Sequence, residues 1–242
     1  VADFKKQGLC SSIEAERLIA FTNNSGPLFI VGTVGIGLFK DTKTGILLLI
    51  THLLACITVG ILFRWWKSSK NKRSSSFIEA SNKLPSRISL SNLGEVLASS
   101  IMNSISTVFL IGGFVVLFSV VISILNSSGC LELIANFLSP ILNAFGLSSK
   151  YIKGIIIGLI ELTNGVCSIA LIASKSISTN IIICAFLLGF GGISVALQVL
   201  SITSKNGIPI KPYLLGKLLQ GLFAAFYTYL ILNNFCFLNL DL

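Results

Sequence analysis

The chain alternates long apolar segments with short polar ones. Residues 45–66 contain a single charged side chain, Arg64, and end in Trp65 and Trp66. About 20 apolar residues suffice to cross a bilayer, and tryptophan gathers at its interfaces. We therefore predict a membrane-spanning helix over residues 45–66. Comparable apolar runs predict ordinary spans at about residues 107–125, 179–201 and 212–232.

Two other segments are amphipathic. In residues 88–106, leucine and isoleucine recur at helical spacing and leave the opposite face to serine, asparagine and Glu95. Residues 131–146 carry a similar apolar stripe, interrupted by Pro140. A stripe of this kind predicts a helix that lies at the membrane interface or against the bundle. The second segment also fits a short re-entrant helix.

Two further apolar runs are interrupted. Residues 11–39 contain the stretch TNNSGP at 22–27, and residues 151–174 contain Glu161 followed by TNG at 163–165. Asparagine, serine and glycine favour turns, and proline lacks an amide donor. Lipid-facing backbone must be fully hydrogen-bonded, so an unwound stretch survives only beside protein or a water-filled cavity. We predict two broken or re-entrant helices.

The two breaks resemble each other. IAFTN at 19–23 and IELTN at 160–164 both place Thr-Asn after an isoleucine and two further residues. Paired interrupted helices are typical of transport sites near the membrane midplane. The GFGG run at 189–192 fits a packing face as well as a ligand loop. The predicted solute-binding residues are Thr22, Asn23, Asn24, Ser25, Gly26, Glu161, Thr163, Asn164, Gly165, Gly191, Gly192, Ser194 and Gln198.

Glu161 has two interpretations. A carboxylate at membrane depth costs about 2.5–3.5 kcal/mol, and acids inside a membrane are usually functional. Glu161 would then hydrogen-bond the solute, carry a coupling proton or cap the facing break. The structural interpretation is that it satisfies exposed amides around Asn23 and Asn164. The sequence leaves both open.

The composition is that of an integral membrane protein. Hydrophobic residues make up 53% of the 242 positions and charged residues 11%, whereas a soluble domain carries about 25% charged residues. We predict an all-α, multi-pass integral membrane bundle. Much of the net charge of +9 lies in residues 64–87, which predicts a cytoplasmic loop. The predicted parts are residues 1–66, a broken helix plus the first full span; residues 67–89, the basic cytoplasmic loop; and residues 90–242, the amphipathic helix and membrane bundle containing the second broken helix.

The remaining chemistry is sparse. The six cysteines lack the spacing of a metal site and are interpreted as apolar packing residues. The one histidine, His52, is interpreted as packing, with a proton site as the alternative. No grouping fits a catalytic triad, a metal cluster or a phosphate loop, so we expect no enzyme, no cofactor and no nucleic-acid partner. The expected partners are the bilayer and a small solute. The chain opens without methionine, and we expect a fragment of a longer membrane protein.

Three motifs resemble one family. AERLIAFTNNSGPLFIVGTVG at 15–35, IELTNGVCSIALIASK at 160–175 and LGFGGISVALQVLS at 188–201 are similar to the sporulation integral membrane protein YlbJ (SpoVV) family. That family belongs to the nucleoside-recognition, or Gate, group, which resembles the core of concentrative nucleoside transporters. The resemblance implies Gate repeats, the ability to pair as a homodimer, and transport of dipicolinic acid across the outer forespore membrane during sporulation.

Three functions follow as alternatives. The first is a transporter of a small polar solute, dipicolinate by the resemblance. The second is a nucleoside transporter, whose neutral substrate would accept Glu161 more readily than a dianion would. The third is a sporulation membrane scaffold that transports nothing. Half-helix N-termini with asparagine and serine donors suit a dianion.

Overall fold

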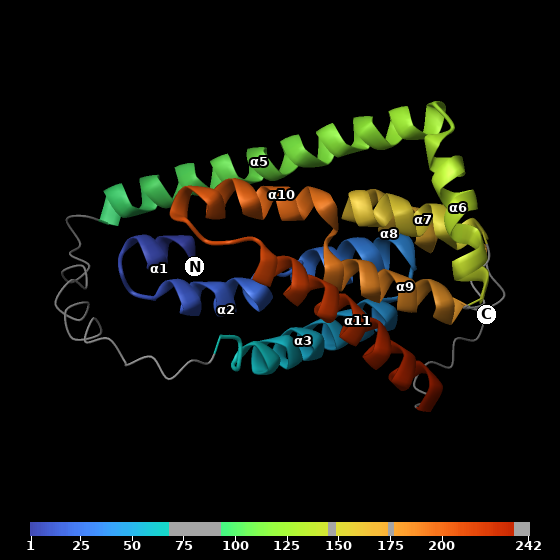
Figure 1. The fold of residues 1–242 in the computed structure, drawn as a ribbon, viewed down its shortest axis with the longest axis horizontal. Helices are drawn as coiled ribbons and strands as arrows, with labels where there is room; N and C mark the ends of the chain where they lie inside the picture. Colours follow the sequence, from blue (N-terminus) through green and yellow to red (C-terminus); the bar gives the residue numbers. More distant parts are fainter. Residues whose placement is uncertain (68–92, 145–148, 174–176, 235–242) are drawn as a thin grey trace.

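The computed structural model describes residues 1–67, 93–144, 149–173 and 177–234, and the regular structure within them is helical, with no strand. The helices lie side by side as one elongated bundle (Figure 1). Most of the predicted basic loop, residues 67–89, lies outside the described residues. The elements are α1 (Ala2–Lys6), α2 (Ser12–Thr22), η1 (Leu28–Leu38), α3 (Thr42–Phe63), α5 (Leu93–Ser127), α6 (Cys130–Ala144), α7 (Ser149–Ile160), α8 (Leu162–Ala170), α9 (Ile177–Phe190), α10 (Gly192–Thr203), η3 (Ser204–Asn206) and α11 (Lys211–Asn234).

The first predicted break is confirmed. Helix α2 starts in a capping box, in which Ser11 and Glu14 satisfy each other's backbone amides. Glu14 lies outside the candidate spans, and the hydrogen bonds from Ser11 hold the pKa of its carboxyl below the usual value. The helix ends at Thr22, and the chain resumes in η1, which has the wider hydrogen bonding of a π-helix. Asn23 to Gly26 lie between them without helical structure.

Long helices form the core around this break. Among the described residues, four segments are long and apolar enough to cross a membrane: Thr42–Phe63, Leu93–Ser127, Ile177–Asn206 and Lys211–Asn234. The predicted spans at 45–66 and 212–232 therefore correspond to α3 and α11. Helix α11 packs against α9, α3 and α2. Glycines permit this close packing, because a Cβ on Gly189 of α9 would lie 2.7 Å from the Cα of Gly221 of α11.

One predicted boundary is wrong. The amphipathic segment 88–106 and the span 107–125 were expected as separate helices, but α5 runs without interruption from Leu93 to Ser127. Its hydroxyls return hydrogen bonds to the carbonyls four residues earlier, as from Ser104 to Ser100 at 2.8 Å. The polar face therefore does not interrupt the helix. At 1.5 Å per residue, 35 residues give about 52 Å, more than the 30 Å or so of a bilayer's hydrocarbon core.

The predicted span at 179–201 corresponds to the candidate span Ile177–Asn206, but this span is broken internally and is not one continuous helix. Helix α9 ends at Phe190, and α10 begins at Gly192 after Gly191, which has a φ of +85°. Gly192 has a φ of +81° as well. Glycine enters this left-handed region without the penalty that a Cβ imposes. The second predicted break is confirmed at Glu161, between α7 and α8.

The two later breaks cross each other. A Cβ on Gly192 would lie 3.0 Å from the carbonyl oxygen of Gly158 and 3.3 Å from the amide nitrogen of Leu162. The break between α9 and α10 therefore rests on the break between α7 and α8. In Figure 1, α7 and α10 lie end to end near the middle of the bundle, beneath α5. The interrupted backbone is thus kept within protein.

Candidate functional site

A cavity of about 370 Å³, with polar groups set in a largely apolar lining, lies where the three breaks come together. The N-terminal break contributes Asn23 to Gly26, the second contributes Glu161 and Thr163, and α9–α10 contributes Gly191 and Gln198. Helix α5 closes one side with Ile111 and Val115. The volume falls in the usual range of small-molecule sites, about 300–1,000 Å³. The remaining lining residues are Phe29, Leu162, Leu188, Val195 and Lys217.

Lys217 brings a positive charge to this cavity. Lys217 lies on α11 and is only 3% exposed. The ammonium donates to the carbonyl of Asn23 at 2.6 Å and to Oε1 of Gln220 at 3.0 Å. An ammonium has three N–H donors, so one remains for the cavity after these two bonds. Lys217 was not among the predicted site residues, although a lysine three residues before a glutamine within an apolar span is a visible signal.

The N-terminal break is fastened to α11 by side chains. Asn23 Nδ2 donates to the Tyr213 hydroxyl at 3.2 Å, and Gln220 Nε2 donates to Asn24 Oδ1 at 2.7 Å. Asn24 Nδ2 in turn donates to the Phe21 carbonyl at 2.7 Å, which would otherwise be an open helix end. These bonds replace the helical hydrogen bonds that the break gives up. The break is therefore an ordered wall of the cavity.

His52 extends the polar network away from the cavity. It is buried on α3, and its Nε2 lies 3.4 Å from Nε2 of Gln220. Because Gln220 Nε2 can only donate, His52 accepts in this contact. Its Nδ1 has no hydrogen-bond partner among the described residues. The interpretation of His52 as a packing residue is thus incomplete, since it supports a residue that in turn holds Lys217 and Asn24.

Glu161 caps α8. Its carboxylate accepts the amides of Thr163 at 3.0 Å and Asn164 at 2.8 Å, and the residue is 1% exposed. Asp41 caps α3 in the same way, through the amides of Lys43 and Thr44. A carboxylate at a helix N-terminus is stabilised by the helix dipole. Part of the negative charge of Glu161 is therefore compensated by α8.

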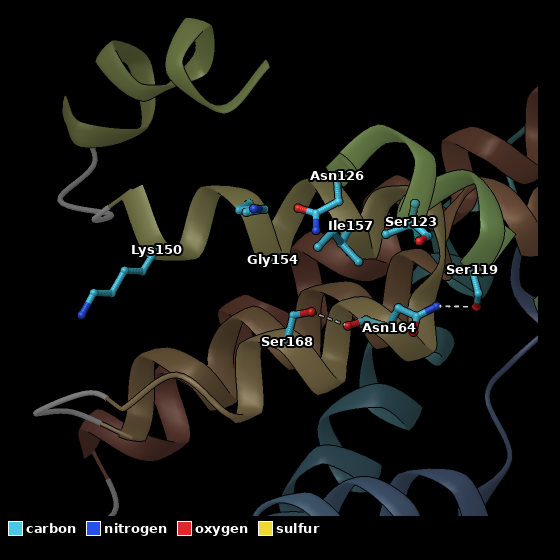
Figure 2. Close-up of a pocket in the computed structure, with 10 residues that line it drawn as sticks. Ser119, Ser123, Asn126, Lys150, Gly154, Ile157, Asn164 and Ser168 are labelled. Atoms are coloured by element: carbon cyan, nitrogen blue, oxygen red, sulfur yellow. Dashed lines mark hydrogen bonds between the residues drawn. The ribbon is translucent and has the colours of Figure 1, made fainter. Parts of the chain in front are cut away.

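Eight predicted site residues line this cavity: Asn23, Asn24, Ser25, Gly26, Glu161, Thr163, Gly191 and Gln198. The other five do not. Thr22 ends α2, Gly192 rests on the α7–α8 break, and Ser194 is buried with no partner for its hydroxyl among the described residues. Gly165 packs against the backbone of Gly158, where a Cβ would overlap it. Asn164 points instead toward Ser119 and a second cavity (Figure 2).

The described residues hold no group of three or more histidine, cysteine or acidic side chains that could bind a metal ion. The arrangement can instead bind a small solute through amides, hydroxyls and one ammonium. Four candidate spans, one of them broken at Gly191, and two further broken helices in the described residues define a class. The protein is a multi-pass integral membrane protein with a cavity at its helix breaks that holds several polar side chains.

Comparison with known proteins narrows this class. Residues 108–207 match the Gate family, described as nucleoside recognition. The chain is 32% identical over 240 residues to the sporulation integral membrane protein YlbJ of Bacillus subtilis (strain 168). The aligned region covers 95% of this chain and 59% of YlbJ. The chain thus spans less than two-thirds of this relative. The predicted resemblance to that family is confirmed, and neither description names an enzymatic activity. No solved structure matches the chain.

Proposed function

We propose that the chain forms the solute-binding core of a membrane transporter for a small organic anion. The transported solute is dipicolinic acid, which moves across the outer forespore membrane during sporulation. The observation that carries this proposal is the Lys217 ammonium at a cavity built from three helix breaks. Similarity to a sporulation membrane protein supports the cellular setting.

Charge balance favours an anion in the cavity. Glu161 is the one acidic side chain among the described lining residues, and both of its oxygens already accept amides from α8. The Lys217 ammonium makes two hydrogen bonds and retains one N–H donor. A buried charge needs a counter-charge or strong hydrogen bonds, and a carboxylate solute supplies both to Lys217. Asn23 and Ser25 add neutral donors that can orient a second carboxylate.

A nucleoside is the second candidate, because the family that matches residues 108–207 is described by nucleoside recognition. The amide and hydroxyl groups of Asn24, Thr163 and Gln198 can bind sugar hydroxyls. A nucleoside carries no charge for Lys217 to neutralise. The two candidates therefore differ in how strongly their binding depends on this lysine.

The first test is equilibrium binding of dipicolinate and uridine to the purified full-length protein. Lys217→Gln keeps a hydrogen-bond donor and removes the charge. A hydrogen bond to a charged group contributes about 1.5–3 kcal/mol, so dipicolinate affinity should fall about tenfold or more. The control is Lys211→Gln, on the exposed start of the same helix, which should bind normally. Binding of uridine without dipicolinate would instead favour the nucleoside candidate.

A further inference from the structure

A second polar cavity, of about 420 Å³, lies between α5, α7 and α8 (Figure 2). On α5 it is lined by Ser119, Ser123 and Asn126, which share one face at spacings of four and three residues. The opposite face of that helix is apolar, with Val120 and Ile124 exposed. Polar groups on a membrane helix usually face the bundle or a water-filled cavity. This face of α5 is therefore better suited to a water-filled cavity than to lipid.

Its far end is basic. Lys150 and Lys153, from the first turns of α7, line the cavity. Lys153 lies 3.7 Å from the Glu132 carboxylate, whereas Lys150 is exposed and forms no ion pair within the described residues. Two lysines against one glutamate leave a positive entrance. Such an entrance raises the local concentration of an anion.

Its near end adjoins the central cavity. Asn164 Nδ2 donates to Ser119 Oγ at 2.8 Å, and both residues line the second cavity. Val115, one turn earlier on α5, and Thr163, next to Asn164, line the central cavity. A hydrogen bond between two side chains thus stands at the boundary between the cavities. In Figure 2, Ser119 and Asn164 lie at the opposite end of the cavity from Lys150.

We propose that this second cavity is the vestibule of the transport path and a second, weaker site for the same organic anion. The solute rests between Ser123 and the α7 lysines and reaches the central cavity when the contact between Asn164 and Ser119 separates. Helix α7, whose first turn holds Lys150, lies toward the end of the bundle where α3 begins and away from the start of α5 (Figure 1). The vestibule therefore opens on the membrane side opposite the start of α5. This inference rests on the proposed transport of dipicolinate.

The charge of the vestibule is tested by uptake into proteoliposomes. The double variant Lys150→Gln/Lys153→Gln should raise the KM for dipicolinate about threefold or more, since steering by charge is lost, with equilibrium affinity at the Lys217 site unchanged. Lys43→Gln, an exposed lysine in the first turn of α3, is the control at the same end of the bundle. An unchanged KM in the double variant would overturn the vestibule.

The path itself is tested by filling it. Ser123→Phe places a ring in the cavity and should abolish uptake while binding at the central site persists. Val120→Phe, on the exposed apolar face of the same helix, should transport normally. Equal uptake by both variants would contradict a transport path through the second cavity, but it would not contradict solute binding at the central cavity. Absence of uptake by the unaltered protein would instead overturn the proposed function, and the vestibule with it.

Discussion

Two buried charges, Glu161 and Lys217, play different parts at the same cavity. Both carboxylate oxygens of Glu161 accept hydrogen bonds, from the amides of Thr163 and Asn164, so its geometry is that of a helix cap. Lys217 reaches across from α11 and holds the Asn23 carbonyl. We therefore assign the positioning role to Glu161 and the contact with the solute to Lys217.

The variant Glu161→Gln tests this division. The glutamine amide can accept from only one of the two backbone N–H groups, and its NH₂ would face the other. Loss of a helix cap costs about 0.5–2 kcal/mol, so we expect a lower melting temperature in detergent, with dipicolinate affinity reduced less than in Lys217→Gln. Full stability combined with abolished binding would show that Glu161 contacts the solute directly.

Both residues are charges within apolar runs, but the sequence marks Glu161 more clearly than Lys217. Glu161 was conspicuous because an acid followed by Thr-Asn-Gly interrupts an apolar run. Lys217 sits in a span that reads as ordinary, and its importance depends on Asn23, nearly two hundred residues earlier in the chain. Such a contact is created by the packing of α11 against α2, which no local pattern encodes.

At the level of elements, the site depends on helices that stop in the same place. Gly191 and Gly192 turn the chain at positive φ, and Gly192 rests on the backbone between Gly158 and Leu162. Each break therefore supplies protein contact for the unwound backbone of the other.

We expect Gly192→Ala to destabilise the protein. Alanine at a φ of +81° costs about 1–2 kcal/mol, and its Cβ would press on the Gly158 carbonyl at 3.0 Å. The control is Gly112→Ala on α5, where an added Cβ meets nothing within 4 Å. A lowered melting temperature in detergent for the first variant alone supports the crossing of the breaks. Equal melting temperatures would contradict it.

Helix breaks could be predicted from the sequence only where the local signal was strong. The breaks at TNNSGP and at Glu161 were predicted because several turn-forming or polar residues occur together. The break at Gly191 was not, since glycine in a membrane helix also serves close packing. The continuity of α5 was missed because its serines return hydrogen bonds to their own helix instead of ending it.

At the level of the whole molecule, the two cavities lie on either side of one contact between α5 and α8. The central cavity is bordered by the three breaks and by α11, whereas the second lies between α5, α7 and α8 and reaches the first turns of α7. This arrangement offers an anion a positive entrance, a hydrogen-bonded barrier and a lysine beyond it. We propose this arrangement as a route for a small dicarboxylate, in keeping with the similarity to a sporulation membrane protein.

The most direct test of this account is uptake of labelled dipicolinate into proteoliposomes that contain the full-length protein. The account predicts uptake by the unaltered protein and by Lys211→Gln, and its loss in Lys217→Gln with the protein still folded and inserted. Equal uptake by Lys217→Gln and the unaltered protein would contradict the central claim that this ammonium binds the transported anion.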